Sequence, residues 1–365
     1  MTAVACDGLA SGRRDFSFER TSAVSVGDSL GYVRFVGTAH AEGSAYVITS
    51  AAQGNILVVS SDKEFPRVIL SDSVIRAFAV GSVGSRVWVS DDAARRVIFF
   101  RTDSAGSSWL PVPTIHPHGQ PRVVGVLETE TVFVEEWPPD ANGDTLVKPL
   151  VRVGRDSTVI VDSLLEIGGI IDLSGTNGSA RLRQPWQYSD LAVMAANNSS
   201  LLILRQRPPS LGSLEVTVTV EELGDSGLPV SAPWKMVFPA VQIADSHVSG
   251  WLQSMIRDSA FAELLGGRER ATATLAGMLF RPTSIPPVQR VIAMPRNALL
   301  VERTPMADSV RRWELWTRQG LQGVMTVPQG LEIRAVADTT VWAVERKSRN
   351  NVERVVRGYF RPTVR

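Results

Sequence analysis

A short phrase recurs along the chain, and this repeat limits the fold more than any other feature of the sequence. In each copy a β-rich run ends in an acidic residue, a polar turn follows, and an arginine precedes a second β-rich run. Neighbouring copies lie about 30 to 45 residues apart, which is the spacing of the blades of a β-propeller. The copies occupy residues 56–70, 88–100, 300–316 and 342–360.

Most of the remaining chain consists of short runs rich in β-branched and aromatic residues, separated by Gly, Ser and Asn. Several runs are apolar on both faces, as expected of strands stacked between neighbouring sheets. One propeller can absorb all 365 residues, 44% of them hydrophobic, as a single domain. The predicted fold class is all-β, a six-bladed β-propeller, with blades near residues 30–70, 74–115, 121–165, 170–222, 287–328 and 332–360.

Two segments depart from the repeat. Residues 1–20 are interpreted as an N-terminal tether or the remainder of a signal segment, so the propeller domain is assigned to residues 21–365. Residues 205–285 form an irregular insertion, in which apolar residues at helical spacing predict one amphipathic helix over residues 249–265. The apolar stripe of this helix is expected to pack on the outside or one end of the barrel, or to serve as a lid or docking helix.

The two ends of the chain are predicted to pair with each other and so to close the ring of blades. The last β-rich run reaches Phe360, and an N-terminal strand near residues 22–26 is expected to pair with it. Such pairing hides the unpaired edge of the last blade.

Charge and composition exclude several classes of partner. The net charge is +1 and the arginines are dispersed, so we expect no nucleic-acid partner. No apolar run is long enough to predict a transmembrane segment. A single cysteine excludes an internal disulfide. We expect a monomer.

The single cysteine, Cys6, follows the small residues 2–5. This pattern resembles the end of a bacterial lipoprotein signal, in which the cysteine is lipidated after cleavage, although the charged start and apolar core of such a signal are missing. On this interpretation the protein is extracytoplasmic, meaning periplasmic, secreted or an outer-membrane lipoprotein with a lipid anchor. The alternative is a chance match and a cytoplasmic protein.

The C-terminal third carries the strongest resemblance to a known family. The order of its β-rich runs, with the proline pair Pro286-Pro287 and a Val-Pro-x-Gly turn at residues 327–330, is similar to the last two blades of the six-bladed β-propeller family related to NHL-repeat proteins. Members of that family are bacterial and mostly uncharacterised. The resemblance covers roughly residues 45–360. It implies a propeller with a central channel but no single function, because this frame hosts lyases, lactonases, receptors and scaffolds.

His116 and His118 are the strongest local signal for chemistry. In an extended chain the i, i+2 spacing places both imidazoles on one face, where they can share a divalent metal. His40, in the loop of another blade, is a candidate third ligand. The alternative is that both histidines are exposed loop side chains.

Acidic residues that follow inner strands offer a second candidate metal site. Carboxylates and amide oxygens suit calcium, as in a propeller lactonase. The alternative is that each acid pairs with the arginine that follows it, as Asp92 would with Arg95 or Arg96. We therefore expect no cofactor, with one divalent metal, Zn or Ca, as the alternative. The candidate calcium ligands are Asp91, Asp92, Glu135, Glu136, Asn177, Asn197 and Asn198.

The tryptophans fall into two groups. One group recurs at matching blade positions and is predicted to fill the wedge between neighbouring sheets: Trp88, Trp313, Trp316 and Trp342. The other group lies next to prolines and predicts aromatic loops on one rim, where a carbohydrate or peptide can stack: Trp137, Trp186 and Trp234. Plain loop packing is the alternative for this second group.

The sequence shows no Gly-x-Ser-x-Gly nucleophile elbow and no glycine-rich phosphate loop, so we name no catalytic residue. The function we expect is a non-catalytic β-propeller that binds a protein, peptide or glycan through rim loops, as a binding or scaffold protein. One alternative is a metal-dependent lyase or lactonase with its site over the central channel. Another is a cytoplasmic scaffold.

Overall fold

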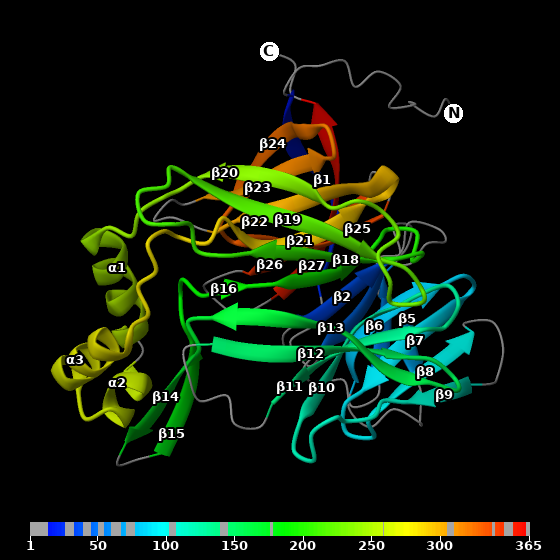
Figure 1. The fold of residues 1–365 in the computed structure, drawn as a ribbon, viewed down its shortest axis with the longest axis horizontal. Coiled ribbons are helices and arrows are strands. Elements are labelled where there is room, and N and C mark those ends of the chain that lie inside the picture. Colours follow the sequence, from blue (N-terminus) through cyan, green and yellow to red (C-terminus); the bar gives the residue numbers. More distant parts are fainter. Residues whose placement is uncertain are drawn as a thin grey trace.

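The computed structural model of the chain consists mainly of antiparallel β-sheets (Figure 1). The residues that it describes are 14–25, 33–38, 45–49, 55–59, 67–70, 77–101, 107–138, 145–175, 178–257, 259–304, 310–337, 340–346 and 353–362.

Four sheets are meanders, in which each strand pairs with the next along the chain. The first contains β2 (Val33–Thr38), β3 (Ala45–Thr49), β4 (Asn55–Val59) and β5 (Arg67–Leu70). The second contains β6 (Ala77–Val83), β7 (Arg86–Asp91), β8 (Arg96–Arg101) and β9 (Ser107–Pro111). The third contains β10 (Gln120–Val126), β11 (Val132–Trp137), β12 (Thr145–Val153) and β13 (Thr158–Ile167), and adds the short β16 (Tyr188–Ser189). The fourth contains β17 (Leu191–Met194), β18 (Leu201–Gln206), β19 (Glu215–Leu223) and β20 (Trp234–Pro239).

The largest sheet has eight strands and joins the two ends of the chain. The N-terminal strand β1 pairs antiparallel with β27, from Phe16 opposite Pro362 to Ser25 opposite Arg354. The first residues of β1 also pair, in parallel, with β24. Residues 14–20 of the predicted tether are therefore part of a strand. The strands are β21 (Val288–Met294), β22 (Ala298–Arg303), β23 (Val310–Thr317), β24 (Gly320–Pro328), β25 (Leu331–Ala337), β26 (Thr340–Arg346), β27 (Glu353–Pro362) and β1 (Arg14–Ser25).

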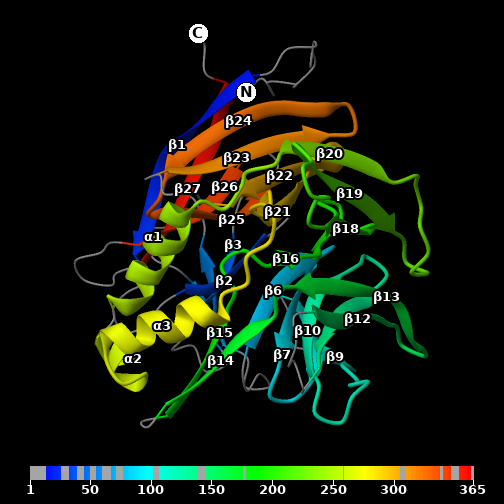
Figure 2. The same ribbon diagram turned by 60° about the vertical axis from the view of Figure 1, so that its left-hand side comes forward.

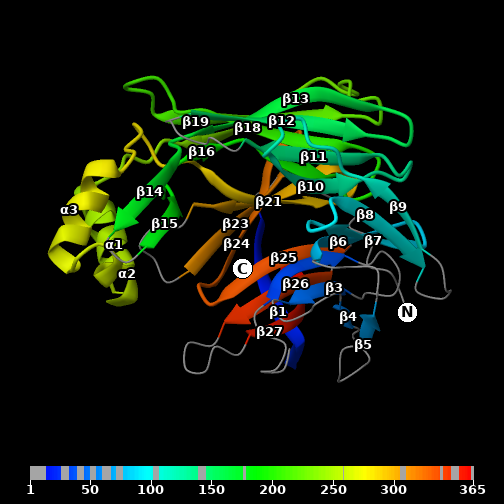
Figure 3. The same cartoon turned by 90° about the horizontal axis from the view of Figure 1, so that it is seen from below.

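Six strands, which we call the inner strands, contact one another in a closed circuit. They are the first strands of the four meanders together with β21 and β25 of the eight-stranded sheet. β2 contacts β6, β6 contacts β10, β10 contacts β17, β17 contacts β21, β21 contacts β25, and β25 contacts β2. Figure 3 shows the sheets arranged around the inner strands, of which β6, β10, β21 and β25 are labelled. Meanders arranged around a ring of inner strands are the architecture of a β-propeller.

A β-bulge marks most of these inner strands. It lies at the second residue of β2, β6 and β21 and further along β10 and β25, whereas β17 pairs without interruption. A bulge bends a strand and redirects its side chains. A bulge is therefore a recurring feature of the inner strands. The residues inserted at the bulges are Arg34, Phe78, Val124, Gln289 and Arg334.

The core lies between neighbouring sheets, and the repeated tryptophans are buried there as predicted. Trp313 and Trp342 are fully buried, and Trp88 and Trp316 are almost so. Trp316 of β23 meets Phe238 of β20 at 5.1 Å between ring centroids, across the contact between two sheets.

The predicted fourth blade, residues 170–222, is wrong in its boundaries. β14 (Ile170–Gly175) and β15 (Gly178–Arg183) form a separate hairpin, and the fourth meander occupies residues 191–239. The hairpin buries Ile171 and Leu173 against the helices rather than against a neighbouring blade. A period of two residues identifies a strand but does not indicate which surface its apolar face covers.

The prediction of one helix over residues 249–265 is also wrong. Three helices occur in the described part of the insertion: α1 (Asp245–Ile256), α2 (Ser259–Leu264) and α3 (Arg268–Met278). The apolar stripe of α1 is confirmed, since Val248 and Leu252 are buried in the cluster with the β14–β15 hairpin. α3 was missed because only Ala271 and Leu275 are buried on it, which is too short a stripe to detect. Figures 1 and 2 show the three helices together at one side of the molecule, beside the hairpin.

Candidate functional site

A cavity of about 1190 Å³ is lined by the inner strands β6, β10, β17, β21 and β25. Side chains from β11, β12, β13 and β15 also reach its wall. We call it the central cavity. Its volume exceeds that of an ordinary pocket for a small ligand, which is roughly 300 to 1,000 Å³.

The basic and acidic side chains on the wall of the central cavity differ in their exposure to solvent. Three lining arginines are exposed and two are half-buried, whereas every acidic side chain among the described lining residues is buried. The cavity therefore presents cationic groups, while its carboxylates lie within the protein. The arginines are Arg122, Arg183, Arg290, Arg296 and Arg334; the acids are Glu135, Glu166 and Asp190.

Five of these lining residues form a cluster that we call the polar corner: Arg122, Glu135, Lys148, Glu166 and Arg183. At its centre the ammonium of Lys148, only 4% exposed, lies 3.4 Å from a carboxylate oxygen of Glu135 and 3.4 Å from one of Glu166. A buried ammonium is costly unless such partners surround it. The second oxygen of Glu166 has no hydrogen-bond partner among the described residues.

Aromatic rings hold the cations of the polar corner. The Lys148 ammonium lies 4.5 Å, and the Arg183 guanidinium 5.0 Å, from the centre of the Trp137 ring. The Arg122 guanidinium lies 5.4 Å from the Phe78 ring and donates to Glu135 at 3.4 Å. Arg183 pairs with no carboxylate in the described ranges. Three cations thus face two carboxylates, which leaves one positive charge in excess.

The polar corner was not predicted from the sequence, although the burial pattern along β12 gives one indication of it. Along β12, Leu146, Lys148 and Leu150 alternate with more exposed residues, and all three are buried. A lysine on the apolar face of a strand requires a carboxylate partner. That pattern predicts a buried ion pair at Lys148, but it does not indicate that Glu166 on the next strand provides it.

His116 and His118 lie in an exposed turn that Glu136 holds in place. The backbone N–H groups of Ile115 and His116 donate to the two carboxylate oxygens of Glu136 at 2.6 and 2.7 Å. No group of three His, Cys, Asp or Glu side chains able to hold a metal occurs in the part of the chain that the structure describes. His40, the candidate third ligand, lies outside that part, so the shared metal site stays a prediction.

The candidate calcium ligands are distributed over several sheets. Asp91 lies 3.5 Å from Arg96, and Glu302 lies 2.7 Å from Arg311, so acids at strand ends do meet the arginine that follows. Glu135 belongs to the polar corner and Glu136 to the histidine turn. Asn198 donates from its side chain to the backbone oxygen of Ser82. Asn177 lies outside the described residues, as does Cys6.

The three rim tryptophans pack in different places. Trp137 contacts the cations of the polar corner. Trp186 is buried against the helices, so it is not an exposed loop ring. Trp234 is half-buried against the core between the fourth meander and the eight-stranded sheet. These three side chains do not gather on one surface, and a shared stacking platform is not formed.

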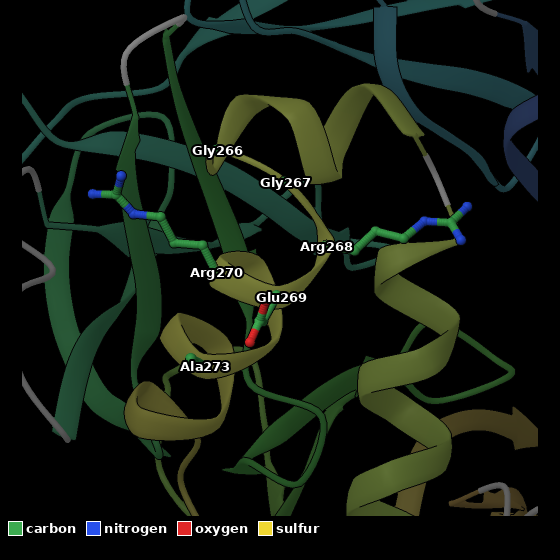
Figure 4. Close-up of a pocket in the computed structure, with 6 residues that line it drawn as sticks. All are labelled: Gly266, Gly267, Arg268, Glu269, Arg270 and Ala273. Atoms are coloured by element: carbon green, nitrogen blue, oxygen red, sulfur yellow. The ribbon is translucent and has the colours of Figure 1, made fainter.

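A second, shallower pocket of about 450 Å³ lies at the turn before α3. Figure 4 shows that the side chains of Arg268 and Arg270 point away from one another. The charges therefore do not converge on a common point. The pocket is lined by Gly266, Gly267, Arg268, Glu269, Arg270 and Ala273.

None of the helices in the described ranges has the length and apolar character needed to cross a lipid bilayer.

Comparisons with known proteins find similarity in structure only. No family model matches the sequence, and no curated protein matches it. Regucalcin, a calcium-binding protein from Agrobacterium tumefaciens, is 9% identical over 96% of this chain and 99% of its own, with a TM-score of 0.46. A DUF4221 family member from Bacteroides vulgatus is 8% identical over 97% and 100%, with a TM-score of 0.46.

A catalytically inactive virginiamycin B lyase from Staphylococcus aureus, solved with quinupristin, is 9% identical over 94% of this chain and 99% of its own, with a TM-score of 0.42. These similarities do not show membership of the NHL-related family. The assignment to the propeller architecture rests on the strand order and contacts of this chain.

Proposed function

We propose that this chain is a six-bladed β-propeller whose central cavity binds an organic anion. The closed circuit of inner strands supports six blades. On this count the eight-stranded sheet comprises two blades, which β1 joins by pairing with both β24 and β27. The proposed role is binding rather than catalysis.

The exposure of the lining charges carries the proposal. Arg122 and Arg183 are exposed to the cavity, whereas Glu135, Glu166 and Asp190 are buried. A cleft lined by charges of one sign concentrates counter-ions. The planar guanidinium of arginine also matches a carboxylate with two parallel hydrogen bonds.

The net charge of the whole chain is only +1, so this local excess of positive charge is a feature of the cavity wall. Over the whole sequence 38 basic residues offset 37 acidic ones, so the cationic wall is not the consequence of a basic protein. Asp190 is neutralised within the protein, because it accepts from Arg205 at 3.0 Å and from Arg207 at 3.1 Å. Glu135 and Glu166 are likewise held by Lys148. Arg183, which pairs with no carboxylate among the described residues, is left to face the ligand, with Arg122 beside Glu135.

Calorimetric titration with the sodium salts of hexanoate, malate and glutamate tests the proposal, with hexanol as the uncharged probe. At least one carboxylate is expected to bind, less tightly as salt increases. Arg183→Gln is expected to weaken that binding about tenfold or more, because a charge-assisted contact contributes roughly 1.5 to 3 kcal/mol. Arg268→Gln, an exposed arginine outside the cavity, is the matched control. Binding that is absent, or equal in the two variants, would refute the proposal.

Recognition of a protein, peptide or glycan at the rim is the second candidate. Trp109 favours it, since this side chain is 61% exposed on β9, the outer strand of its sheet. Binding at such a surface would be abolished by Trp109→Ala and unaffected by Arg183→Gln, which separates the two functions.

The extracytoplasmic location and the lipid anchor at Cys6 are proposals as well. Metabolic labelling of the cells that make the protein with an alkyne fatty acid tests both. The wild type is expected to carry the label and the Cys6→Ser variant to lack it. An unlabelled wild type would leave the cytoplasmic scaffold as the favoured alternative.

A further inference from the structure

The inner strand β17 differs from the other inner strands of the ring. It pairs without a bulge, and all four of its residues, Leu191, Ala192, Val193 and Met194, are half-buried and line the central cavity. Among the described lining residues β21 also places an apolar run on the wall, Val291 to Met294, but Ile292 and Ala293 of that run are buried, whereas all four residues of β17 are half-buried. We call this run the apolar strip.

The apolar strip lies next to the polar corner. β17 contacts β10, which carries Arg122. A Cβ atom at Gly125 of β10 would lie 1.9 Å from the Cγ of Met194, so the methionine side chain packs directly on the β10 backbone. The half-buried Val124 of the β10 bulge also lines the cavity between them. Met194 and Ala192 pack toward the core shared with β10, and Leu191 and Val193 toward the core shared with β21, so the apolar strip adjoins the cationic groups at its Met194 end.

We infer that the ligand of the central cavity is an amphipathic organic acid, with its carboxylate at Arg183 and Arg122 and its apolar body along the apolar strip. This inference rests on the proposed function and adds the ligand class to it. Arg183 has no carboxylate partner among the described residues, so it supplies the charge-assisted contact. Half-buried Leu191, Val193 and Met194 lose their remaining contact with water when an apolar body covers them.

The chemistry of the wall disfavours a sugar as the ligand. A sugar presents many hydroxyl donors, and the strongest acceptors of the wall, its carboxylates, are buried and paired with cations. A small hydrophilic diacid would satisfy the arginines but would leave the apolar strip in water. An acid with an extended apolar body satisfies both.

A homologous series of straight-chain acids tests the inference. The probes are acetate, butanoate, hexanoate and octanoate, titrated calorimetrically into the full-length chain, with malate and hexanol for comparison. Each methylene group buried along the apolar strip is expected to lower the Kd roughly fourfold. Malate and hexanol, which lack the apolar body and the charge respectively, are each expected to bind more weakly than hexanoate.

Matched variants assign the two halves of the ligand to the two parts of the wall. Arg183→Gln is expected to weaken all four acids by a similar factor and to leave the chain-length dependence intact. Met194→Gln, which keeps the unbranched shape, and Val193→Thr, which keeps β-branching, are expected to flatten that dependence and to change acetate little. Met278→Gln, an exposed methionine on α3, and Arg268→Gln are the controls. Retained folding is checked by the thermal midpoint of each variant.

The outcomes separate this inference from the proposed function. Carboxylates that bind through Arg183 with no dependence on chain length, or malate binding as tightly as hexanoate, would overturn the amphipathic ligand and leave anion binding intact. A chain-length dependence that both Met194→Gln and Val193→Thr leave unchanged would also overturn it. If no acid binds, both proposals fall.

Discussion

Single side chains fix turns between the sheets, and Glu136, which holds the turn between β9 and β10, is the clearest case. Its carboxylate is fully buried and accepts from two backbone N–H groups of the histidine turn. Gly119 completes the turn, because a Cβ there would lie 1.9 Å from a Glu136 oxygen. The turn thus depends on the absence of a side chain at one residue and on a carboxylate at another.

Glu136→Ala leaves both N–H groups without their partner in a partly buried site. We expect the free energy of unfolding to fall by about 3 kcal/mol, since each unsatisfied buried group costs roughly 1 to 3 kcal/mol. Urea denaturation measures this loss, with the exposed Glu128→Ala as the control at about 0.5 kcal/mol or less. Equal midpoints for the two variants would show that Glu136 does not hold the turn.

Asp225 links two sheets and makes stability depend on pH. The hydrogen bond from Thr131 lowers the pKa of Asp225 below its ordinary value of 3.8; partial burial opposes this, and Thr129 and Arg152 add to it. A lowered folded-state pKa stabilises the protein above the unfolded pKa, and this stabilisation is lost as pH falls through the folded value. We expect Asp225→Asn to reduce the loss of thermal stability between about pH 5 and pH 2. The effect is modest because the side chain is 46% exposed. An acid profile identical to that of the wild type would contradict this.

Between strands, a network of ion pairs joins β21 to β25. Arg290 on β21 pairs with Glu332 on β25 and donates to the backbone oxygen of Ile333 at 3.2 Å. Arg334 donates to Glu332 at 3.0 Å. Burial alone would raise the pKa of Glu332, but the charges of Arg290 and Arg334 outweigh it and the pKa is lowered. The contact between these two inner strands therefore depends on an ionised Glu332.

Glu332→Gln removes the charge and retains the shape. We expect it to lower the free energy of unfolding by about 3 kcal/mol, because it leaves two arginines short of their carboxylate. The wild type should lose this stabilisation as pH falls through the lowered pKa of Glu332, and the variant should not. Chemical denaturation at pH 7 and at pH 3 measures both effects. A variant as stable as the wild type at pH 7 would show that the pair contributes nothing.

The same elements show what the sequence could and could not predict. The strands, the buried tryptophans and the acid–arginine pairs follow from local patterns, because each depends on residues within one or two strands. The β14–β15 hairpin and α3 were misassigned because their small apolar faces do not specify a partner. The polar corner assembles Arg122, Lys148 and Arg183 from three strands, and no spacing in the sequence encodes which strands adjoin.

For the whole molecule, β1 closes the ring. It pairs along its length with β27 and briefly with β24. Deleting residues 1–25 removes this strand and exposes the edge of β27, whereas deleting residues 1–13 leaves it in place. We expect the longer deletion to lower the thermal midpoint by roughly 5 to 10 °C and the shorter one to change it little. Calorimetry of both variants measures the difference, and equal midpoints would mean that β1 does not close the ring.

The crystal structure of the protein soaked with octanoate locates the ligand without relying on any variant. We expect a carboxylate in the central cavity with oxygens about 2.7 to 2.9 Å from the Arg183 guanidinium and an alkyl chain along Leu191, Val193 and Met194. Octanoate bound only on the outer strands or at the rim, with the central cavity filled by water alone, would contradict it.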